Sequence, residues 1–243
     1  MNLLLAIDAG NSFVKCGYHD GRAWQAQQRV VLADFCADPL RYFQTPPARI
    51  VVSNVAGKRV QMALESAFPH LDMQWIKAER QACGVVNQYD PPQQLGADRW
   101  AALIAARAMT REACVVVSAG SALTVDLLAE DGHFLGGAIA PGFELMRDAL
   151  AHGTNAIRPP VGNVSPCPTN TADAVQTGVV YALTGLIARM AAMDEEKHKR
   201  PMICILTGGA AHWIAPHLNR PVQVVDNLVL EGVLLLAQKE IRP

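Results

Sequence analysis

Three short stretches of the chain combine residue types that suit phosphate binding and proton transfer. The first reads Asp8-Ala9-Gly10-Asn11-Ser12-Phe13-Val14-Lys15. Gly10 permits a tight turn whose amides can face an anion, and Lys15 adds an ammonium on the returning segment. Asp8 carries the hard oxygen that Mg²⁺ prefers, here through a water molecule. The pattern predicts an anion site, although a plain β-hairpin with an exposed lysine would have the same residues.

The second stretch repeats this pattern as Ser118-Ala119-Gly120-Ser121-Ala122-Leu123-Thr124-Val125-Asp126. Asp8 aligns with Ser118 and Gly10 with Gly120, so both stretches indicate an apolar strand, a glycine turn and another strand. Two glycine turns from duplicated modules can hold one polyphosphate from both sides. A second, purely structural hairpin is the alternative.

The third stretch starts at Tyr89, continues through a proline-rich loop and ends in Gly96-Ala97-Asp98-Arg99-Trp100. We expect a helix to begin here, and its dipole favours an ionised carboxylate at Asp98 in the first turn. Such a carboxylate can accept a proton, and Arg99 can anchor a carboxylate or another acceptor. A helix-capping aspartate beside a surface arginine would have the same residues.

Two further glycine-rich segments follow predicted strands. Residues 136–142 (G-G-A-I-A-P-G) indicate either a tight chain reversal or a close approach of backbone to a ligand. Thr207-Gly208-Gly209 precedes a predicted helix, which suits a nucleotide contact through the helix N-terminal amides.

Secondary structure must position these stretches, and the apolar pattern predicts it. The first half should contain strands at Leu3–Ile7, Ser12–Tyr18, after Asp20-Gly21, at Arg49–Ser53 and at Met73–Ile76, helices at Asp34–Phe43, Lys58–Phe68 and Ala97–Arg111, and a loop at 83–94. The second half should contain strands at 115–117, Leu123–Leu128, Phe134–Ile139, Met202–Leu206 and Val222–Val225, with helices at Phe143–Leu150, Thr171–Met193, after 207–209 and at Asn227–Lys239. One β-β-β-α-β-α module is thus used twice. We predict an α/β fold with two domains, residues 1–111 and 112–243, each a mixed sheet flanked by helices.

Length and composition narrow the class of protein. With 243 residues, of which 51% are hydrophobic and 18% charged, the chain is too apolar for disorder. Lys and Arg (21) nearly balance Asp and Glu (22), so the strong positive field of a nonspecific nucleic-acid or anionic-membrane binder is missing. No apolar run approaches the ~20 residues of a spanning helix. We expect a cytoplasmic protein with no nucleic-acid or membrane partner.

Taken together, these motifs resemble the type III pantothenate kinases. The resemblance rests on D-A-G-N-S-F-V-K from Asp8, Y-D-P-P-Q-Q-L-G-A-D-R-W from Tyr89, A-G-S-A-L-T-V-D from Ala119, G-G-A-I-A-P-G from Gly136 and N-T-A-D-A from Asn170. Residues 207–209 (T-G-G) and 228–232 (L-V-L-E-G) complete the set, which covers nearly the whole chain. The glycine turns alone would indicate only the wider superfamily of acetate and sugar kinases, Hsc70 and actin.

The resemblance implies two ribonuclease-H-like domains, a homodimer, and ATP-dependent phosphorylation of pantothenate to 4'-phosphopantothenate, the first step of coenzyme A biosynthesis. Residues 8–15 would bind ATP as the first phosphate loop, with Mg²⁺ near Asp8, and Ser121 matches a threonine that contacts ATP. The matches to pantothenate-binding positions are Tyr89, Gly96, Ala97, Asp98, Arg99 and Thr171. Asp98 would be the catalytic proton acceptor, and Thr171 would lie near the dimer interface.

The chain departs from the family pattern at Ser118. Family members commonly carry an aspartate there, and it binds a monovalent cation such as K⁺. A neutral hydroxyl attracts a cation less strongly than a carboxylate does, so we expect K⁺ or NH₄⁺ to bind weakly, if at all, at the usual position. Asp126 remains as a second acid close by in the sequence.

Two other functions fit parts of the pattern. One is a kinase of the same superfamily that acts on a sugar or another small alcohol, against which the segment Y-x-x-P-x-Q-L-G-x-D-R argues. The other is a nucleotide-binding regulator that has lost catalysis. The retained residues Asp8, Lys15, Asp98 and Arg99 argue against lost chemistry.

Overall fold

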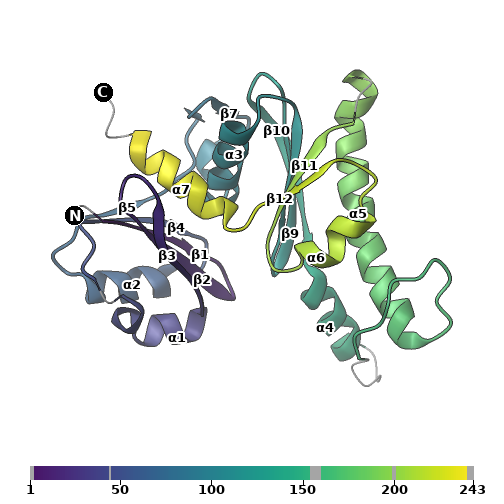
Figure 1. The fold of residues 1–243 in the computed structure, drawn as a ribbon, viewed down its shortest axis with the longest axis horizontal. Helices are drawn as coiled ribbons and strands as arrows, with labels where there is room; N and C mark the ends of the chain where they lie inside the picture. The colour runs from purple at the N-terminus through teal and green to yellow at the C-terminus, as the bar shows by residue number, and fades with distance from the viewer. Residues whose placement is uncertain (1–2, 44, 154–159, 199–200, 240–243) are drawn as a thin grey trace. The chain divides into compact units, whose positions relative to one another are not determined.

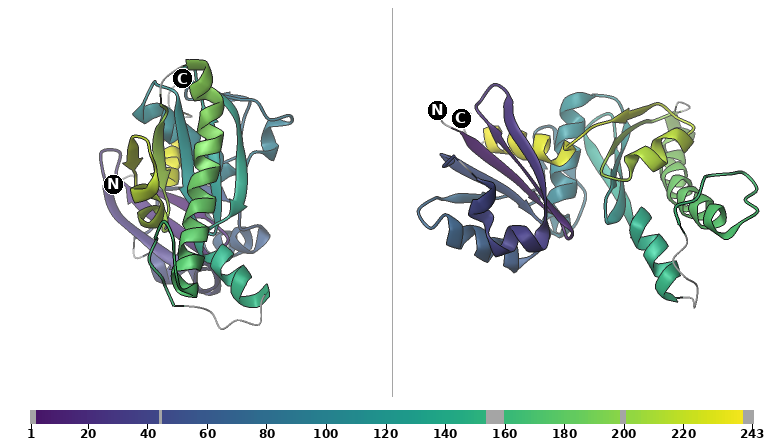
Figure 2. Two further views of the ribbon diagram at one scale, coloured as in Figure 1. Left: turned by 90° about the vertical axis from the view of Figure 1, so that its right-hand side faces the viewer. Right: turned by 60° about the horizontal axis from the view of Figure 1, so that its bottom comes forward.

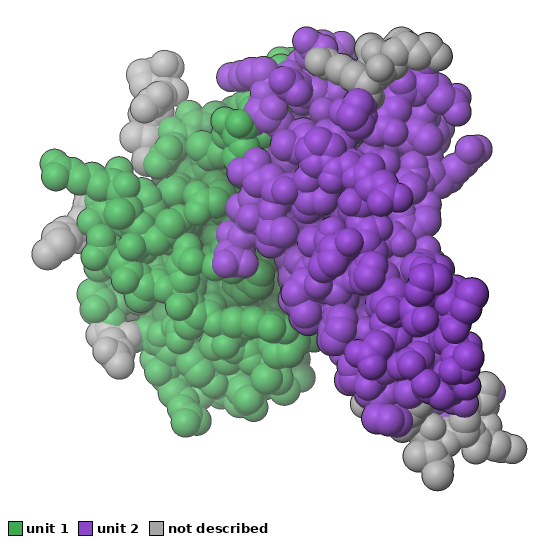
Figure 3. Space-filling view, turned by 45° about the vertical axis from the view of Figure 1, so that its right-hand side comes forward, with its two compact units in different colours: residues 1–109, 227–243 green, residues 110–226 purple. Residues whose placement is uncertain are grey.

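The computed structural model describes residues 3–43, 45–153, 160–198 and 201–239. The chain divides into two compact units, coloured separately in Figure 3: unit 1 comprises residues 1–109 and 227–243, and unit 2 comprises residues 110–226. This division differs from the predicted domains 1–111 and 112–243 because the last helix belongs to unit 1.

Unit 1 is built on a five-stranded mixed sheet in the order β3-β2-β1-β4-β5. Its strands are β1 (Leu4–Ala9), β2 (Phe13–His19), β3 (Trp24–Val31), β4 (Arg49–Asn54) and β5 (Met73–Trp75). Strands β1, β2 and β3 are antiparallel neighbours, whereas β1, β4 and β5 run parallel. The run Ile50-Val51-Val52 is buried on both faces of the sheet, as central parallel strands require.

Helices cover both faces of this sheet. Helices α1 (Leu32–Ala37) and α2 (Lys58–Ala67) lie on one face, and α3 (Ala97–Met109) and α7 (Leu228–Lys239) lie side by side on the other (Figure 1). The core beneath α1 and α2 contains Phe35, Val60 and Leu64. The sheet is therefore buried on both sides, and polar side chains in it need a specific reason to be there.

Helix α7 is joined closely to the rest of unit 1. Trp24 Nε1 donates a hydrogen bond to Glu231 Oε1 at 2.7 Å. The next residue, Gly232, lies so close to α3 that a Cβ atom there would collide with the carbonyl of Ala101. The L-V-L-E-G motif thus allows two helices to pack backbone to backbone, which explains why the C-terminal segment belongs to unit 1.

Unit 2 repeats the architecture of unit 1. Its strands are β8 (Cys114–Ala119), β9 (Ala122–Leu128), β10 (His133–Pro141), β11 (Ile203–Thr207) and β12 (Val222–Val224). They lie in the order β10-β9-β8-β11-β12, with β8, β9 and β10 antiparallel and β8, β11 and β12 parallel. Strand order and direction match those of unit 1, so the predicted α/β fold with a duplicated module is confirmed.

The helices of unit 2 are α4 (Phe143–Gly153), α5 (Thr171–His198) and α6 (Ala211–Ile214), followed by the 3₁₀ turn η3 (Ala215–His217). Figures 1 and 2 both show α5 lying across one face of the sheet. By length and composition alone α5 could span a membrane, contrary to the expectation that no apolar run is long enough. Its apolar residues Val179, Leu183 and Ile187 belong to the core of unit 2, which accounts for this composition.

Residues 83–94 do not form the single loop that was predicted. They include β7 (Val85–Asn87), which pairs with β6 (Gln81–Ala82), and the 3₁₀ turn η2 (Pro92–Gln94). Cys83 and Gly84 both have positive φ, at 47° and 79°, as the two-residue turn of a tight hairpin requires. A Cys-Gly pair lacks the usual Asn-Gly or Asp-Gly signal, so the hairpin was missed.

The helix predicted at 34–43 is also interrupted. Helix α1 ends at Ala37, and a separate 3₁₀ turn, η1 (Pro39–Tyr42), follows it. Asp38, between them, has φ of −154° and ψ of 84°. The ring of Pro39 disfavours a helical conformation in the preceding residue, so the helix cannot continue.

Candidate active site

The turn between β1 and β2 brings three polar side chains together in unit 1. The Gly10 amide donates to the carbonyl of Phe13 at 3.0 Å, which closes the turn. In the strand register, Asp8 lies opposite Lys15 on β2 and opposite Ser53 on β4. Directly paired residues project from the same face of a sheet. A carboxylate, an ammonium and a hydroxyl therefore lie side by side where these strands meet the turn.

The residues of the predicted phosphate loop differ in what they can offer a ligand. Ala9 and Val14 are fully buried in the core of unit 1, so only their backbone could contact phosphate. Asn11 and Ser12 are exposed at the turn. The guanidinium carbon of Arg29 lies over the Phe13 ring, 3.6 Å from the ring centroid. The exposed tip of the loop thus consists of backbone, small polar groups and one covered ring.

The surroundings of Asp8 disfavour the ionised form of its carboxyl group. Burial and, to a smaller extent, the nearby Asp98 carboxylate raise its pKa from 3.8 to about 7, against the opposing effect of the Lys15 ammonium. The Ser53 hydroxyl also opposes the rise through its proximity, although Ser53 Oγ forms no hydrogen bond with any residue that the structure describes. Among the described residues, Asp8 Oδ1 is buried with no hydrogen-bond partner. A buried carboxylate oxygen of this kind needs a cation or a proton to compensate it.

This environment fits a hydrated Mg²⁺ ion. Asp8 supplies one hard oxygen, and Mg²⁺ keeps several waters and takes further ligands from substrate phosphates rather than from a protein cage. The described part of the chain contains no group of three or more His, Cys, Asp and Glu side chains that could hold a metal by themselves. Asp8 is therefore the residue that would hold the ion.

Asp98 lies in the first turn of α3, within electrostatic reach of Asp8. Its Oδ1 accepts a hydrogen bond from the Arg99 amide at 2.8 Å. The helix begins directly before it, where the Trp100 amide donates to the Gly96 carbonyl at 2.9 Å. A Cβ atom at Gly96 would lie only 2.6 Å from Asp98 Oδ1. Gly96 therefore leaves the space in which the Asp98 carboxylate is held.

Arg99 points into the protein and pairs with Tyr89. Its side chain is 6% exposed, which excludes the alternative of a surface arginine. Arg99 Nη1 donates to the Tyr89 hydroxyl at 3.1 Å, and the guanidinium carbon lies 5.6 Å from the centroid of the ring. Two residues predicted to bind substrate from separate elements are thus in direct contact.

In unit 2, glycines surround the turn between β8 and β9. The Gly120 amide donates to the Ala122 carbonyl at 3.0 Å, and the Gly142 amide donates to the Ser121 carbonyl at 2.8 Å. A Cβ atom at Gly142 would collide with the Gly120 carbonyl, and one at Gly208 would collide with the Ala119 carbonyl. Both glycine-rich segments therefore allow backbone to pack closely on this turn, which is the chain-reversal explanation for residues 136–142.

A row of hydroxyl groups lies beside the same turn. In the register, Ser118 on β8 is paired with Thr124 on β9 and with Thr207 on β11. Thr207 Oγ1 is buried with no hydrogen-bond partner among the residues that the structure describes. The acidic Asp126 is two residues further along β9 and is 1% exposed. At position 118, where the family pattern has an aspartate, this row therefore presents neutral hydroxyl oxygens.

Thr171 begins α5 at the rim of a groove in unit 2. The helix is capped by Asn170, whose Oδ1 accepts from the Asp173 amide at 2.9 Å. Thr171 lines a groove of about 980 Å³ together with apolar side chains of α4 and α5, among them Leu145 and Leu150. The predicted substrate residue thus lies at the edge of a large apolar depression.

The structure groups the predicted site residues by unit. Unit 1 brings Asp8, Lys15 and Asp98 together, and it places Tyr89 against Arg99. Ser121 and Thr171 belong to unit 2, on the β8–β9 turn and at the start of α5. Ser53 was missed, although its position at the end of a buried strand pattern could have indicated a polar site.

The family model described as type III pantothenate kinase matches residues 4–193. The chain belongs to this family. Proteins named type III pantothenate kinase from Azoarcus sp. and Nitrosospira multiformis are 46% and 44% identical to it, over 97% and 98% of this chain and 90% and 92% of theirs. One from Aromatoleum aromaticum is 44% identical over 98% of this chain and 99% of its own.

Solved structures share the fold at low identity. A conserved Campylobacter jejuni protein with a Baf family transcriptional activator description has a TM-score of 0.66 at 21% identity, covering 98% of this chain and 100% of its own. MreB 5 of Spiroplasma citri, bound to AMPPNP, has a TM-score of 0.54 at 9% identity, covering 99% and 98%. At such low identities, these two structures show only that this type III pantothenate kinase shares their fold.

Proposed function

We propose that this protein transfers a phosphoryl group from ATP to pantothenate, which is the first step of coenzyme A biosynthesis. Family membership supports both substrates, because relatives over 40% identical along nearly their whole length carry the name. The observation that carries the proposal is the arrangement in unit 1. There the Asp8 carboxylate, whose Oδ1 has no hydrogen bond with any described residue, lies opposite Lys15 and within reach of Asp98.

On the acceptor side, Asp98 orients the primary hydroxyl of pantothenate and takes its proton. A carboxylate is too weak a base to deprotonate an alcohol in advance, so the proton moves as the new O–P bond forms and ADP leaves. Tyr89 and Arg99 bind the acceptor, with the guanidinium matched to its carboxylate. General-base assistance of this kind contributes about 10²–10⁴-fold to turnover.

On the donor side, the backbone amides of residues 8–15 and of the turn at Ser121 bind the phosphates of ATP. Lys15 offsets the negative charge that they bring. Mg²⁺, held near Asp8 through water, would supply charge neutralisation of the phosphates. Binding of the ion and of phosphate also explains why an acid stands at a half-buried position where one of its oxygens, Oδ1, is removed from solvent.

A coupled ADP-release assay tests the proposal. MgATP with pantothenate should give turnover, while ribose, glycerol and a sugar-acid panel should give none above the background of ATP hydrolysis. Faster turnover with a sugar would favour the alternative of a different small-alcohol kinase. Tight nucleotide binding without any ADP release would favour the regulator.

We propose that turnover depends little on K⁺ or NH₄⁺. The row formed by Ser118, Thr124 and Thr207 presents hydroxyl oxygens, which attract a monovalent cation less than a carboxylate does. Replacing K⁺ by tetramethylammonium at constant ionic strength should leave turnover unchanged, and Ser118→Asp should introduce a K⁺ dependence. A wild-type enzyme that stops without K⁺ would contradict this proposal.

We also propose a homodimer that buries the groove between α4 and α5. Two apolar side chains of the groove are well exposed in the single chain, Leu145 at 51% and Leu150 at 45%. Tyr181, which lies on α5 outside the groove lining, is also 48% exposed. Thr171 at the rim would then lie at a subunit boundary. A cytoplasmic location remains part of the proposal. The absence of nucleic-acid and membrane partners is also proposed, and the formal net charge of −1 supports it.

A further inference from the structure

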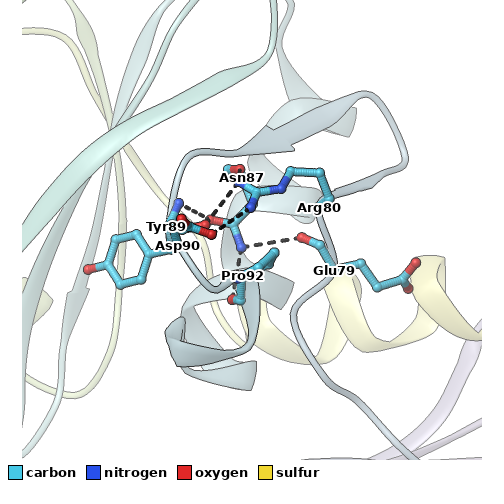
Figure 4. Close-up of polar contacts among 6 residues, drawn as sticks. All are labelled: Glu79, Arg80, Asn87, Tyr89, Asp90 and Pro92. Atoms are coloured by element: carbon cyan, nitrogen blue, oxygen red, sulfur yellow. Dashed lines mark hydrogen bonds and ion pairs between the residues drawn. The ribbon is translucent and has the colours of Figure 1, made fainter.

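The loop that carries Tyr89 is fastened by a residue outside the predicted site, Asn87. This side chain is fully buried, at the end of β7. Its Nδ2 donates to the carbonyls of Glu79 at 3.3 Å and Pro92 at 3.1 Å, and its Oδ1 accepts from the Tyr89 amide at 3.0 Å. One amide group therefore ties together the start of the hairpin, the tyrosine and the proline-rich segment (Figure 4).

A second residue, Arg80, fastens the same loop from the solvent side. Its Nη1 donates to the carbonyls of Asn87 at 3.0 Å and Tyr89 at 2.9 Å. Its Nη2 forms an ion pair with Asp90 Oδ1 at 3.2 Å. The side chain of Arg80 is 53% exposed, so the value of these contacts lies in their geometry more than in charge attraction.

Both polar groups of the Tyr89 backbone are thus fixed. The amide is bound by Asn87 and the carbonyl by Arg80. Figure 4 shows the phenol ring leaving this cluster on the side away from Arg80. The ring hydroxyl then meets Arg99, the neighbour of Asp98 on α3. A fixed backbone leaves the ring only its own two torsions, so its hydroxyl is presented in a narrow range of positions.

We propose that Asn87 and Arg80 are positioning residues for the acceptor substrate. They hold the Tyr89 loop in the conformation that presents the tyrosine hydroxyl and the paired Arg99 guanidinium to pantothenate. The inference rests on the proposed function, because it takes Tyr89 and Arg99 as the pantothenate-binding pair. It assigns the hairpin of β6 and β7 the task of prearranging that pair, which lowers the entropy lost on binding.

The position of the two residues predicts which substrate is affected. Their side-chain hydrogen bonds, in the part of the chain that the structure describes, all go to residues 79–92. None goes to the phosphate loop at residues 8–15. Loss of either side chain should therefore weaken pantothenate binding and leave ATP binding unchanged.

Arg80→Ala is the first test, because a half-exposed arginine can be removed without emptying the core. Loss of its bonds to two carbonyls should raise the KM for pantothenate by about tenfold, since each hydrogen bond of a half-exposed side chain is worth about threefold. The KM for ATP should stay unchanged. Arg80→Lys keeps a single charged nitrogen, so the rise in the KM for pantothenate should be smaller than in Arg80→Ala. Arg22→Ala, at an exposed arginine in the β2–β3 turn, is the matched control.

Asn87→Ala is the second test and should have the larger effect. It removes three hydrogen bonds from a site that water cannot easily refill, since the side chain is 0% exposed. Thermal unfolding shows whether the variant folds. Should it fail to fold, Arg80→Ala and Arg80→Lys still decide the inference.

An unchanged pantothenate KM in Arg80→Ala would overturn the inference, and so would an equal rise in the KM values of both substrates. Hydrogen exchange of the amides at residues 85–90 gives a readout that needs no substrate: exchange should be faster in Arg80→Ala than in the wild type. If the wild-type protein shows no pantothenate turnover, the proposed function is contradicted instead. In that case hydrogen exchange still tests the loop: an unchanged exchange rate in Arg80→Ala would show that Arg80 does not hold it.

Discussion

At the scale of single residues, the charge on Asp8 opposes folding. The pKa of this carboxyl is about 7 in the folded chain, against 3.8 for the free side chain. A group with a raised folded-state pKa adds its full stability below the unfolded value and loses it as the pH rises through the folded value. The stability contributed by Asp8 should therefore fall between about pH 4 and pH 7 and stay low above that range.

Asp8→Asn should consequently stabilise the folded protein while it abolishes activity. Without nucleotide and Mg²⁺, we expect the variant to exceed the wild type at pH 8 by a few kcal/mol, on the order of 1.4 kcal/mol for each unit of pKa shift. At pH 4 the two proteins should unfold at nearly the same temperature. Asp72→Asn, at an exposed position of the same unit, is the control. Equal unfolding temperatures of Asp8→Asn and wild type at pH 8 would disprove the electrostatic explanation.

Gly96 provides a second prediction at this scale. In Gly96→Ala the new methyl group would meet Asp98 Oδ1 at 2.6 Å, and the carboxylate would have to rotate away. Because the end of a side chain can move cheaply, we expect little change in the unfolding temperature. Turnover should fall by about a hundredfold, the usual result of misplacing a reacting group by about 1 Å. Steady-state kinetics and calorimetry check both parts, and an unchanged kcat would contradict the role given to Gly96.

At the scale of elements, the contact between α3 and α7 should carry much of the stability of unit 1. In Gly232→Ala the added Cβ would collide with the backbone of Ala101, which cannot move aside as a side chain can. We expect a loss of about 1–3 kcal/mol in the free energy of unfolding, measured with urea. Gly185→Ala on α5 is the control, because a Cβ there meets nothing within 4 Å. If Gly232→Ala leaves the free energy of unfolding unchanged, α3 and α7 do not pack as closely as described.

The elements also show how far the sequence could lead. Apolar runs and the paired turns after Asp8 and Ser118 were enough to predict the strands and the duplicated sheet, because buried parallel strands leave a continuous apolar signal. The β6–β7 hairpin has no such signal, since its turn uses Cys83 rather than asparagine. The packing of α7 on α3 depends on a long-range contact of Gly232, which no local pattern reveals.

The site was predictable to a similar degree. Asp98 and Arg99 could be found because a motif placed them in the first turn of a helix. The burial of Arg99 and its bond to Tyr89 arise from tertiary packing. Asn87 could not be recognised, because a lone asparagine in a proline-rich stretch usually marks only a turn.

At the scale of the whole molecule, the apolar groove of unit 2 predicts how activity depends on assembly. Leu145→Glu places a charge in the groove between α4 and α5, and it should convert a dimer into a monomer with little pantothenate turnover. Light scattering coupled to gel filtration gives the mass. Leu40→Glu, at a similarly exposed leucine of unit 1 (52%), should change neither mass nor turnover. A monomeric and fully active wild type would rule out the proposed dimer.

The central claim is that one carboxylate at the start of α3 receives the proton of the alcohol, and the kinetics of Asp98→Asn test it most directly. The amide keeps the shape of the side chain but cannot take up the proton, so turnover should fall by about 10²–10⁴-fold while the affinity for ATP, measured by calorimetry, stays unchanged. Asp34→Asn, in the first turn of α1, controls for the loss of a helix-terminal charge. Wild-type turnover in Asp98→Asn would contradict the account.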